Sequence, residues 1–469
     1  MEYYLTAQTE HAERDTEQLS EISARGIHRL AELDPELHGL LEQEQKRQAQ
    51  TMMLVAASSS ADPSVLACKG MSINNITTEG YPGRRFHAGC VQVDQIERLA
   101  ISRAKQVFGA KYANLQPHSG TSANLIVISS MLQPGDCLLG MELNSGGHLT
   151  HGSNASITGR YYRSIGYSVD ERGFIDYKQV AQLAHQHRPK LIICGASSYP
   201  RAIDFAQFRA IADDVGAWLL ADISHIAGLV ATGRHQSPID HAHFTTTSTY
   251  KQLYGPRGGM ILMGKDYLQS TGRDSSSLAK TIQKAVFPFF QGTPDLSAIA
   301  AKARALDQIN RPEFSLITER IIKGAHTLAR GLNLLGYQVV TGGTDNHMVL
   351  VDLSPAGMSG LVAERALESC RIIINKNKIP GDPLPASVTS GIRLGTNTVA
   401  LQGMEGAQLE ICAQLLHKVL SSLTIYSEKN YQLDSSVQEQ VIHQVSDLCT
   451  RFPIPHYPNL APHLSTGVG

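Results

Sequence analysis

One lysine stands where its side-chain amine could act as a nucleophile. Lys251 ends the segment TTTSTYK (245–251) and precedes GPRGG (255–259), so it follows a predicted buried strand in a run of small hydroxyl residues. A poorly solvated lysine loses part of its preference for the charged form, which suits formation of a Schiff base. Taken alone, the motif fits an ordinary surface lysine at a strand end better.

A carboxylate could serve the same chemistry. Asp222 ends the apolar segment WLLAD (218–222), 29 residues before Lys251. Open parallel sheets place their ligands at such strand ends. An aspartate beneath a pyridine ring keeps the ring nitrogen protonated and makes the ring an electron sink. The spacing is typical of enzymes that use pyridoxal 5'-phosphate (PLP), although a helix N-cap explains an isolated aspartate equally well.

Three further motifs could bind parts of such a cofactor and its substrate. The segment PHSGTSAN (117–124) opens a predicted helix with small hydroxyl residues and a glycine, which makes an anion site. His148 in GGHLTHG (146–152) could stack on an aromatic ring, and Arg393 in SGIRLGT (390–396) could clamp a carboxylate. A plain helix cap, a structural histidine and a solvated arginine are the alternatives. The order of the five motifs is more specific than any one of them.

Alternating apolar and amphipathic segments supply the elements that would position these groups. Continuous apolar runs with helical stretches between them predict strands buried on both faces. The pattern predicts an α/β fold with a mostly parallel sheet. The expected strands are Cys137 to Gly140, Leu191 to Gly195, Trp218 to Ala221, Phe244 to Thr247 and Gly259 to Met263. The expected helices include Leu125 to Met131, Tyr177 to His187, Asp204 to Val215 and a long one that begins at Leu296.

The chain divides into three expected parts. These are an N-terminal arm or segment (1–75), a large PLP-binding domain (76–310) and a small C-terminal α/β domain (311–469) with strands at 338–340 and 348–352. The segment EGYPGRR (79–85) is expected to be a loop, because it contains proline and glycines. Asp94 is expected to cap the next helix, with Glu97 three residues later as in a capping box.

Composition limits the class of protein. The 469 residues are 42% hydrophobic and 18% charged, which supports a sizeable core. A net charge of -1 gives no global electrostatic case for binding nucleic acid or an anionic membrane, and no apolar run approaches the roughly 18 residues of a membrane span. The seven dispersed cysteines, with no C-x-x-C pair, indicate reduced thiols in the cytoplasm rather than disulfides or a metal site.

The chain resembles the serine hydroxymethyltransferase family over roughly residues 33–455. The similar segments are GYPGRRFHAGC (80–90), FGAKYANLQPHSG (108–120), PGD (134–136), GGHLTHGS (146–153), ADISHIAGL (221–229), TTTSTYKQLYGPRGG (245–259), GGTDNH (342–347) and VTSGIRLGT (388–396). The resemblance implies a fold-type I PLP-dependent transferase of one-carbon and amino-acid metabolism. It also implies a homodimer or dimer of dimers, with tetrahydrofolate as a possible co-substrate and an amino acid as substrate.

The resemblance also assigns roles by position. Lys251 would form the Schiff base, and Glu79, donated by the partner subunit, would be an acid/base group that contacts folate. The catalytic set that it implies is Lys251, Glu79, His148, Asp222, His225, Tyr250 and His87. The cofactor-binding set is Ser119, Gly120 and Thr121 at the phosphate, Ser197 and His225 near the phenolic oxygen, and His148, Asp222, Lys251, Gly292 and Thr293. The substrate-binding set is Arg393 at the carboxylate and Glu79, His87, Leu143, Gly147, Leu149 and Asn377, and no metal is expected.

The chain departs from the family at several of these contacts. Thr77, Phe86 and His87 stand where the family has tyrosines, and Tyr250 stands where it has histidine. The family's Ser-Glu-Asn segment is Ala57-Ser58-Ser59 here, and its Gly-Gly loop is Gly292-Thr293. Because Lys251, Asp222, Glu79 and Arg393 are all kept, the departures suggest an altered substrate or reaction rather than a dead enzyme.

The leading hypothesis is PLP-dependent aldol-type cleavage or transfer on a β-hydroxy-α-amino acid, in its first version serine/glycine hydroxymethyl transfer with tetrahydrofolate. A folate-independent threonine aldolase or transaldolase, or an α-methylserine-type transferase, is the alternative within this class. A different PLP reaction such as decarboxylation or racemisation is also permitted, because the electron sink is generic. A catalytically weak PLP-binding regulatory protein is the alternative from another class.

Overall fold

The computed structural model describes residues 2–271 and 276–458, with side chains from residue 18 onward. Its centre is a seven-stranded sheet in the order β4-β10-β9-β8-β7-β5-β6. The run from β9 to β6 is parallel, and β10 is antiparallel to both of its neighbours. The strands are β4 (Tyr112–Asn114), β5 (Cys137–Met141), β6 (Arg163–Tyr167), β7 (Leu191–Gly195), β8 (Trp218–Asp222), β9 (Phe244–Ser248) and β10 (Gly259–Met263). The predicted α/β fold is confirmed, with three expected strands one residue longer than predicted.

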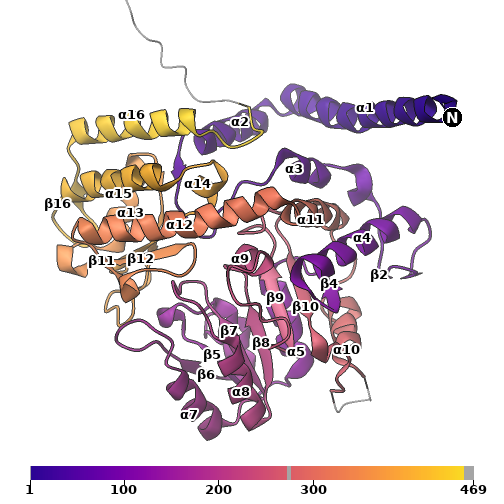
Figure 1. Ribbon diagram of the computed structural model, residues 1–469, viewed down its shortest axis with the longest axis horizontal. Coiled ribbons are helices and arrows are strands. Elements are labelled where there is room, and N and C mark those ends of the chain that lie inside the picture. Colours follow the sequence, from indigo (N-terminus) through magenta and orange to yellow (C-terminus); the bar gives the residue numbers. More distant parts are fainter. Residues whose placement is uncertain (1, 272–275, 459–469) are drawn as a thin grey trace, which may run out of the picture.

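Helices cover both faces of this sheet (Figure 1). Successive residues of β8 point to opposite faces, so Leu219 packs in one core cluster and Leu220 in the other. The first cluster packs against α4 (Val91–Phe108), α7 (Tyr177–His187), α8 (Phe205–Val215) and α11 (Leu296–Ile309). The second packs against α5 (Gly120–Met131) and α10 (Leu278–Lys284). This double burial explains why the strands read as continuous apolar runs.

A second core lies in the C-terminal part of the chain. Its antiparallel sheet has the order β11-β12-β15-β14. These strands are β11 (Gln338–Val339), β12 (Met348–Asp352), β14 (Asn375–Asn377) and β15 (Gly391–Gly395). The helices here are α12 (Pro312–Leu334), α13 (Gly360–Ser369), α14 (Asn397–Leu401), α15 (Gly406–Ser421) and α16 (Ser435–Arg451). The end of the predicted domain, residues 459–469, lies outside the described residues.

Two features join the parts of the chain. The helix α12 packs Phe314 in the first cluster and Ala325 in the C-terminal core. The strand β1 (Met52–Met53) pairs in parallel with β13 (Ile372–Ile373), and this brings Met52 and Leu54 into the C-terminal core. Part of the expected N-terminal segment therefore packs with the C-terminal elements.

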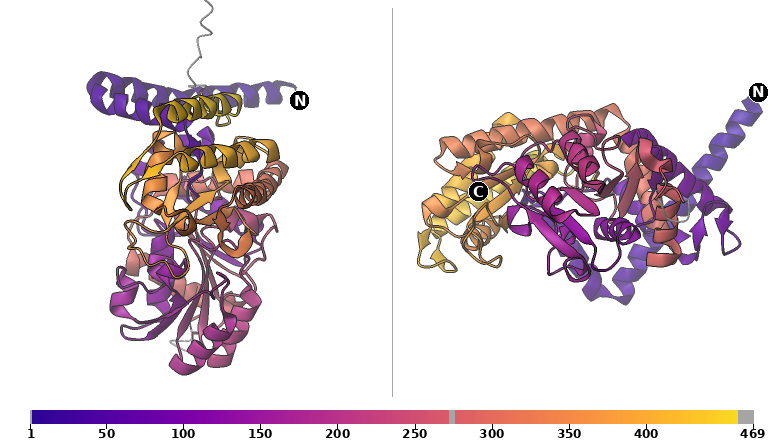
Figure 2. Two further views of the ribbon diagram at one scale, coloured as in Figure 1. Left: turned by 90° about the vertical axis from the view of Figure 1, so that its left-hand side faces the viewer. Right: turned by 90° about the horizontal axis from the view of Figure 1, so that it is seen from below.

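The N-terminal helices are long and polar. The helix α1 (Glu2–Leu33) extends away from the rest of the molecule, and α2 (Pro35–Ala49) begins at Asp34, whose carboxylate accepts from the Leu37 N–H at 3.1 Å (Figures 1 and 2). The shorter elements are α3 (Pro63–Lys69), α6 (Ile157–Tyr161), α9 (Ala227–Ala231) and the strand pair β16 (Thr424–Ile425) and β17 (Tyr431–Gln432). Within residues 2–271 and 276–458, none of the helices is both long and apolar enough to span a membrane.

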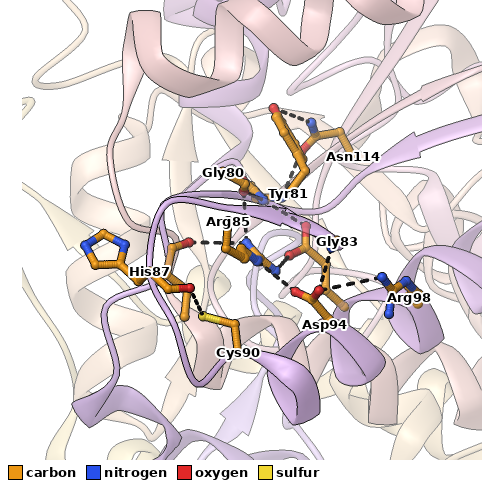
Figure 3. A network of polar contacts seen from close by, with 12 residues as sticks. Gly80, Tyr81, Gly83, Arg85, His87, Cys90, Asp94, Arg98 and Asn114 are labelled. Atoms are coloured by element: carbon orange, nitrogen blue, oxygen red, sulfur yellow. Dashed lines mark hydrogen bonds and ion pairs between the residues drawn. The ribbon is translucent and has the colours of Figure 1, made fainter.

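The expectations for residues 79–97 are wrong in two respects. The expected loop is a hairpin of β2 (Gly80–Tyr81) and β3 (Arg84–Arg85), with the proline and glycine in its turn. The helix α4 begins at Val91, and Asp94 lies inside its first turn rather than at its cap. The reason is a tertiary contact: Asp94 and Glu97 both pair with the buried Arg85 guanidinium, so their carboxylates do not cap the helix (Figure 3).

Candidate active site

The carboxyl ends of the parallel strands meet at one edge of the large sheet, where a cavity of about 300 Å³ opens. Nine of the predicted residues line it: Ser119, Gly120, Thr121, His148, Ser197, Asp222, His225, Tyr250 and Lys251. They come from the ends of β7, β8 and β9, the start of α5 and the loop after β5. Parallel strands bring their carboxyl ends to one edge, so residues more than a hundred positions apart converge here.

Lys251 is held in a setting that favours its neutral form. The residue is 8% exposed and lies three positions after the end of β9. The pKa of Lys251 is lowered to about 8, mainly by burial; Asp222 opposes this shift, and the cations Arg393 and Arg257 add to it. An amine with this pKa is available as a nucleophile near neutral pH, which supports the predicted Schiff-base chemistry.

Asp222 is a buried carboxylate with three donors in contact. Asn124 donates to Oδ2 at 2.8 Å, the Ser224 N–H donates to Oδ1 at 2.9 Å, and His151 Nε2 lies 3.3 Å from Oδ2. Burial alone would raise the pKa of Asp222, but the hydrogen bond and charge of His151 hold it well below its ordinary value. The group is therefore an anion that can pair with a protonated ring nitrogen.

His148 is tied to Asp222 through two intermediate side chains. Its Nδ1 lies 2.8 Å from the Thr150 hydroxyl, and Asn124 donates both to that hydroxyl at 2.9 Å and to Asp222. Burial lowers the pKa of His148 to about 4, so the imidazole is neutral at physiological pH. The ligand atoms of His148, His151 and Asp222 lie within 4.8 Å of one another. That is close enough to share a metal ion or to bind one aromatic ring at its face and its nitrogen.

The start of α5 forms the anion-binding end of the cavity. The Ser119 hydroxyl accepts from the Ser122 N–H at 2.9 Å and so caps the helix. Gly120 allows the helix to approach β9 closely, because an added Cβ would lie 3.1 Å from the Ser248 Cβ. The first-turn N–H groups and the helix dipole favour a phosphate here. Beside it, the Arg257 guanidinium lies 4.2 Å above the centre of the Tyr250 ring.

Two buried polar atoms on the cavity side chains have no partner within the described part of the chain. They are the Ser248 hydroxyl and the Nδ1 of His225. His225 stacks on His347 with their ring centres 5.8 Å apart, and burial lowers its pKa well below the usual value. Buried polar atoms are nearly always hydrogen-bonded in native proteins, so these two point to a missing polar ligand.

Arg393 and Asn377 come from the small sheet and reach the loop after β7. Arg393 donates from Nε to the Asn375 side chain at 3.1 Å and from Nη1 to the Ser197 carbonyl, and burial lowers its pKa to about 10. Asn377 donates to the Ser198 hydroxyl at 2.8 Å. A guanidinium held in this way is pre-oriented for a carboxylate.

Several predicted residues do not line this chain's own cavity. Glu79 is half-buried beside Gly292, where an added Cβ would lie 3.2 Å from Glu79 Oε1. His87 is exposed and points away from the Arg85 guanidinium in Figure 3. Thr293, Gly147, Leu143 and Leu149 do not line the cavity either. Gly147 and the exposed Leu143 and Leu149 flank His148 in the sequence.

Sequence reasoning missed several groups that complete the site. His151 lies within the GGHLTHG motif, but its contact with Asp222 was not predicted. The H-x-x-H spacing was the available signal, because it fits the single 3₁₀ turn (Leu149–His151) that brings the two imidazole rings together. Asn124 and Thr150 lie within two of the motifs, but no role is predicted for them, because their contacts join α5, the 3₁₀ turn and the end of β8, which are far apart in the sequence. Ser248 and Arg257 lie in the lysine motif and also line the cavity.

The residues present fit PLP. A neutral imidazole, a buried carboxylate, a lysine amine and a helix N-terminus surround one cavity, and the unpartnered Ser248 and His225 atoms match a ligand with phosphate and phenolic oxygens. This fold and this set of groups define a PLP-dependent enzyme of fold type I.

The comparisons with known proteins give the family. The sequence profile described as serine hydroxymethyltransferase matches residues 30–416. A serine hydroxymethyltransferase of Cyanothece sp. is 46% identical over 434 residues, which cover 92% of this chain and 97% of that protein. The chain belongs to the serine hydroxymethyltransferase family, whose members use PLP with tetrahydrofolate as co-substrate.

Proposed function

We propose that the protein interconverts serine and glycine by transferring a hydroxymethyl group to or from tetrahydrofolate. The observation that carries this function is the convergence of Lys251, Asp222 and His148 on one cavity, with Arg393 donating to the carbonyl of Ser197, another residue of its lining. Family membership supports the same reaction. When bound, PLP supplies an electron sink for negative charge at the amino acid's Cα.

The contacts support the following roles for the chain's own residues. Lys251 would bind the cofactor's aldehyde carbon through its amine. Asp222, kept anionic by His151, holds a proton on the ring nitrogen, and His148 covers the ring face. The first turn of α5 binds the phosphate, and Arg393 binds the substrate carboxylate.

The residues that do not line the cavity are proposed to act in a second copy of the chain. Glu79 lies beside Gly292 on the hairpin side of the molecule, and Phe86 (76% exposed) packs near Phe287 at 5.6 Å between ring centres. An exposed phenylalanine that packs on a half-buried one next to an acidic group fits a subunit interface. Glu79, His87, Gly292 and Thr293 would then complete the partner's site in a homodimer or a dimer of dimers.

Folate would enter beside the His148 loop. Leu143 and Leu149 are 45% and 44% exposed and offer apolar contacts for a pterin ring. Gly147 cannot carry a side chain, because an added Cβ would lie 2.1 Å from the Met141 carbonyl oxygen. Asn377 donates to the hydroxyl of Ser198, whose N–H donates to the Gly146 carbonyl beside this loop at 3.0 Å. The dispersed cysteines, all unpaired in the structure, support a reducing cytoplasmic location.

The test is an assay of purified protein with serine, threonine and α-methylserine, each with and without tetrahydrofolate. Folate-dependent formation of glycine from serine is the expected result. Faster folate-independent turnover of threonine would contradict the proposal and favour the aldolase alternative. Absence of turnover with all substrates, despite bound PLP, would favour a regulatory protein.

A subunit-mixing experiment tests the shared site. Lys251→Ala and Glu79→Gln are each expected to be inactive, and mixed subunits are expected to recover part of the activity because some sites then contain both native residues. A matched control mixes Lys251→Ala with Asp222→Asn. Both residues line the cavity of the same chain, so each site in a mixed dimer lacks one of them. No activity should therefore return in this control. Equal recovery in the two mixtures would contradict the interface assignment of Glu79.

A further inference from the structure

A lysine outside the predicted site is buried behind the anion-binding end of the cavity. Lys302 lies on α11 and is 2% exposed. Its Nζ donates to the carbonyl oxygens of Leu115 at 2.7 Å, Gly259 at 2.9 Å and Pro117 at 3.2 Å. An ammonium group has three protons, so these three acceptors account for all of them.

The three carbonyls belong to the two segments that form the cavity wall. Leu115 and Pro117 lie immediately before His118 and Ser119, and Gly259 follows Gly258. The two segments are joined to each other by a hydrogen bond from the Gly259 N–H to the Pro117 carbonyl at 2.9 Å. Lys302 therefore hydrogen-bonds both to the loop before α5 and to the first residue of β10.

The ammonium is separated from the cavity by little more than one glycine. A Cβ added to Gly258, which lines the cavity, would lie 2.8 Å from Lys302 Nζ. The charge of Lys302 acts on His118, a residue that lines the cavity. Burial lowers the pKa of His118, and the charge of Lys302 lowers it further. No side chain larger than hydrogen could stand at position 258 without displacing the lysine.

The charge of Lys302 has no hydrogen-bonded counter-ion among the described residues. All three of its acceptors are neutral carbonyls, and Asp295 and Glu97 act on it only at longer range. Burial lowers the pKa of Lys302 to about 7, while these carboxylates raise it and Lys69 lowers it. A buried, uncompensated cation is costly unless an anion joins it, and the adjoining helix N-terminus already favours one.

We propose that Lys302 is a positioning residue for the cofactor's phosphate, bracing the two loops of the phosphate cradle and supplying a positive potential from behind it. The proposal rests on the proposed function, because it takes the ligand at the start of α5 to be the phosphate of PLP. It adds a second source of anion affinity to the helix N-terminus. Lys302 itself does not touch the ligand, since Gly258 lies between them.

The experiment measures ligand binding to cofactor-free protein by thermal shift, with three probes: PLP, inorganic phosphate and pyridoxal, which lacks the phosphate. The variant is Lys302→Met, which keeps the length of the side chain and removes the charge. Lys323→Met is the matched control, because Lys323 is 75% exposed by side chain and pairs only with Glu319 in the same region of α12. Lys302→Gln, which keeps two donors, replaces Lys302→Met if that variant does not fold.

The expected result is that Lys302→Met needs at least about tenfold more PLP and inorganic phosphate for half-maximal stabilisation, while pyridoxal is affected much less. The control should bind all three probes as the wild type does. Equal loss for PLP and pyridoxal would show a general structural role and overturn the proposal, as would unchanged affinity for phosphate. If wild-type protein binds phosphate but not PLP, the proposed function fails while the Lys302 test still stands. If it binds neither probe, both proposals fail.

Discussion

His151 Nε2 lies 3.3 Å from Asp222 Oδ2, and the imidazole is completely enclosed by the protein. The contact places a donor on the one carboxylate oxygen that Asn124 also reaches, so Oδ1 keeps only the Ser224 N–H as a donor. Asp222 is thereby fixed in orientation as well as in charge. Asp222 lines the cavity, whereas His151 contacts the Asp222 carboxylate but is not part of the cavity lining.

Replacement of His151 by leucine is expected to weaken PLP binding by about 1.5–3 kcal/mol, the scale of one hydrogen bond to a charged group. The reason is that loss of the His151 hydrogen bond and charge raises the pKa of Asp222. PLP titration followed by absorbance measures the effect. Asp222→Asn should cost more, and the double variant should cost little more than Asp222→Asn alone. Full additivity of the two effects would show that His151 acts elsewhere.

The stability of the cofactor-free protein is expected to rise with pH because of Lys251. Its pKa is about 8 in the folded protein and about 10.4 in an unfolded chain. Between these values the unfolded state binds more protons, so the free energy of unfolding increases with pH. The contribution is complete above about pH 10.4 and is lost as the pH falls through about 8.

Urea unfolding of wild type and Lys251→Met at pH 7.5 and 9.5 measures this contribution. The wild type should gain stability relative to the variant at the higher pH. The difference in stability between the wild type and Lys323→Met, which removes an exposed lysine, should not change with pH. A difference between wild type and Lys251→Met that stays constant with pH would place the amine in solvent.

Arg85→Met is expected to destabilise the protein by about 3–5 kcal/mol, because it removes the buried cation that pairs with both Asp94 and Glu97. Arg85 pairs with Asp94 at 2.9 Å and with Glu97, and its Nη1 donates to the carbonyls on both sides of Glu79, those of Thr78 at 3.2 Å and Gly80 at 2.9 Å (Figure 3). Urea unfolding gives the size of the effect. The same guanidinium therefore fixes the backbone on each side of the proposed acid/base residue.

Arg98→Met is the control for this prediction. Arg98 lies 3.6 Å from the same Asp94 carboxylate, but its side chain is 55% exposed. Surface pairs of this kind contribute at most about 1 kcal/mol. If both variants lose the same stability, burial of the Arg85 network contributes nothing beyond a surface ion pair.

Arg393→Ala is expected to weaken amino-acid binding by about 1.5–3 kcal/mol, as for a hydrogen bond to a charged group. PLP affinity should hardly change, because Arg393 contacts Asn375 and the Ser197 carbonyl rather than the start of α5. Titration of the PLP-loaded protein with glycine measures the change. Arg330→Ala, at an exposed arginine of α12, serves as the control. Unaltered glycine affinity in Arg393→Ala would mean that the carboxylate binds elsewhere.

The sequence by itself determined five of the seven strands of the large sheet, all but β4 and β6, and the motifs that follow them. The strands Leu191–Gly195 and Gly259–Met263 were predicted to the residue, because burial on both faces leaves a continuous apolar run that needs no tertiary information. Asp222 ends such a run and Lys251 follows a predicted strand by three residues, so both are expected at the sheet edge, although each motif taken alone also fits a purely structural role. The family resemblance then supplied roles that spacing alone left open.

Only the tertiary structure decided how these groups are supported. The capping role expected for Asp94 failed because α4 already begins at Val91 and the Asp94 carboxylate pairs with the Arg85 guanidinium, nine residues earlier, at 2.9 Å. His151, Asn124 and Lys302 were invisible to local patterns, because their partners lie 71, 98 and as many as 187 residues away in the chain. A buried polar group is satisfied by whatever donor or acceptor the fold brings within hydrogen-bond distance, and that choice is made by the packing of distant segments rather than by sequence neighbours.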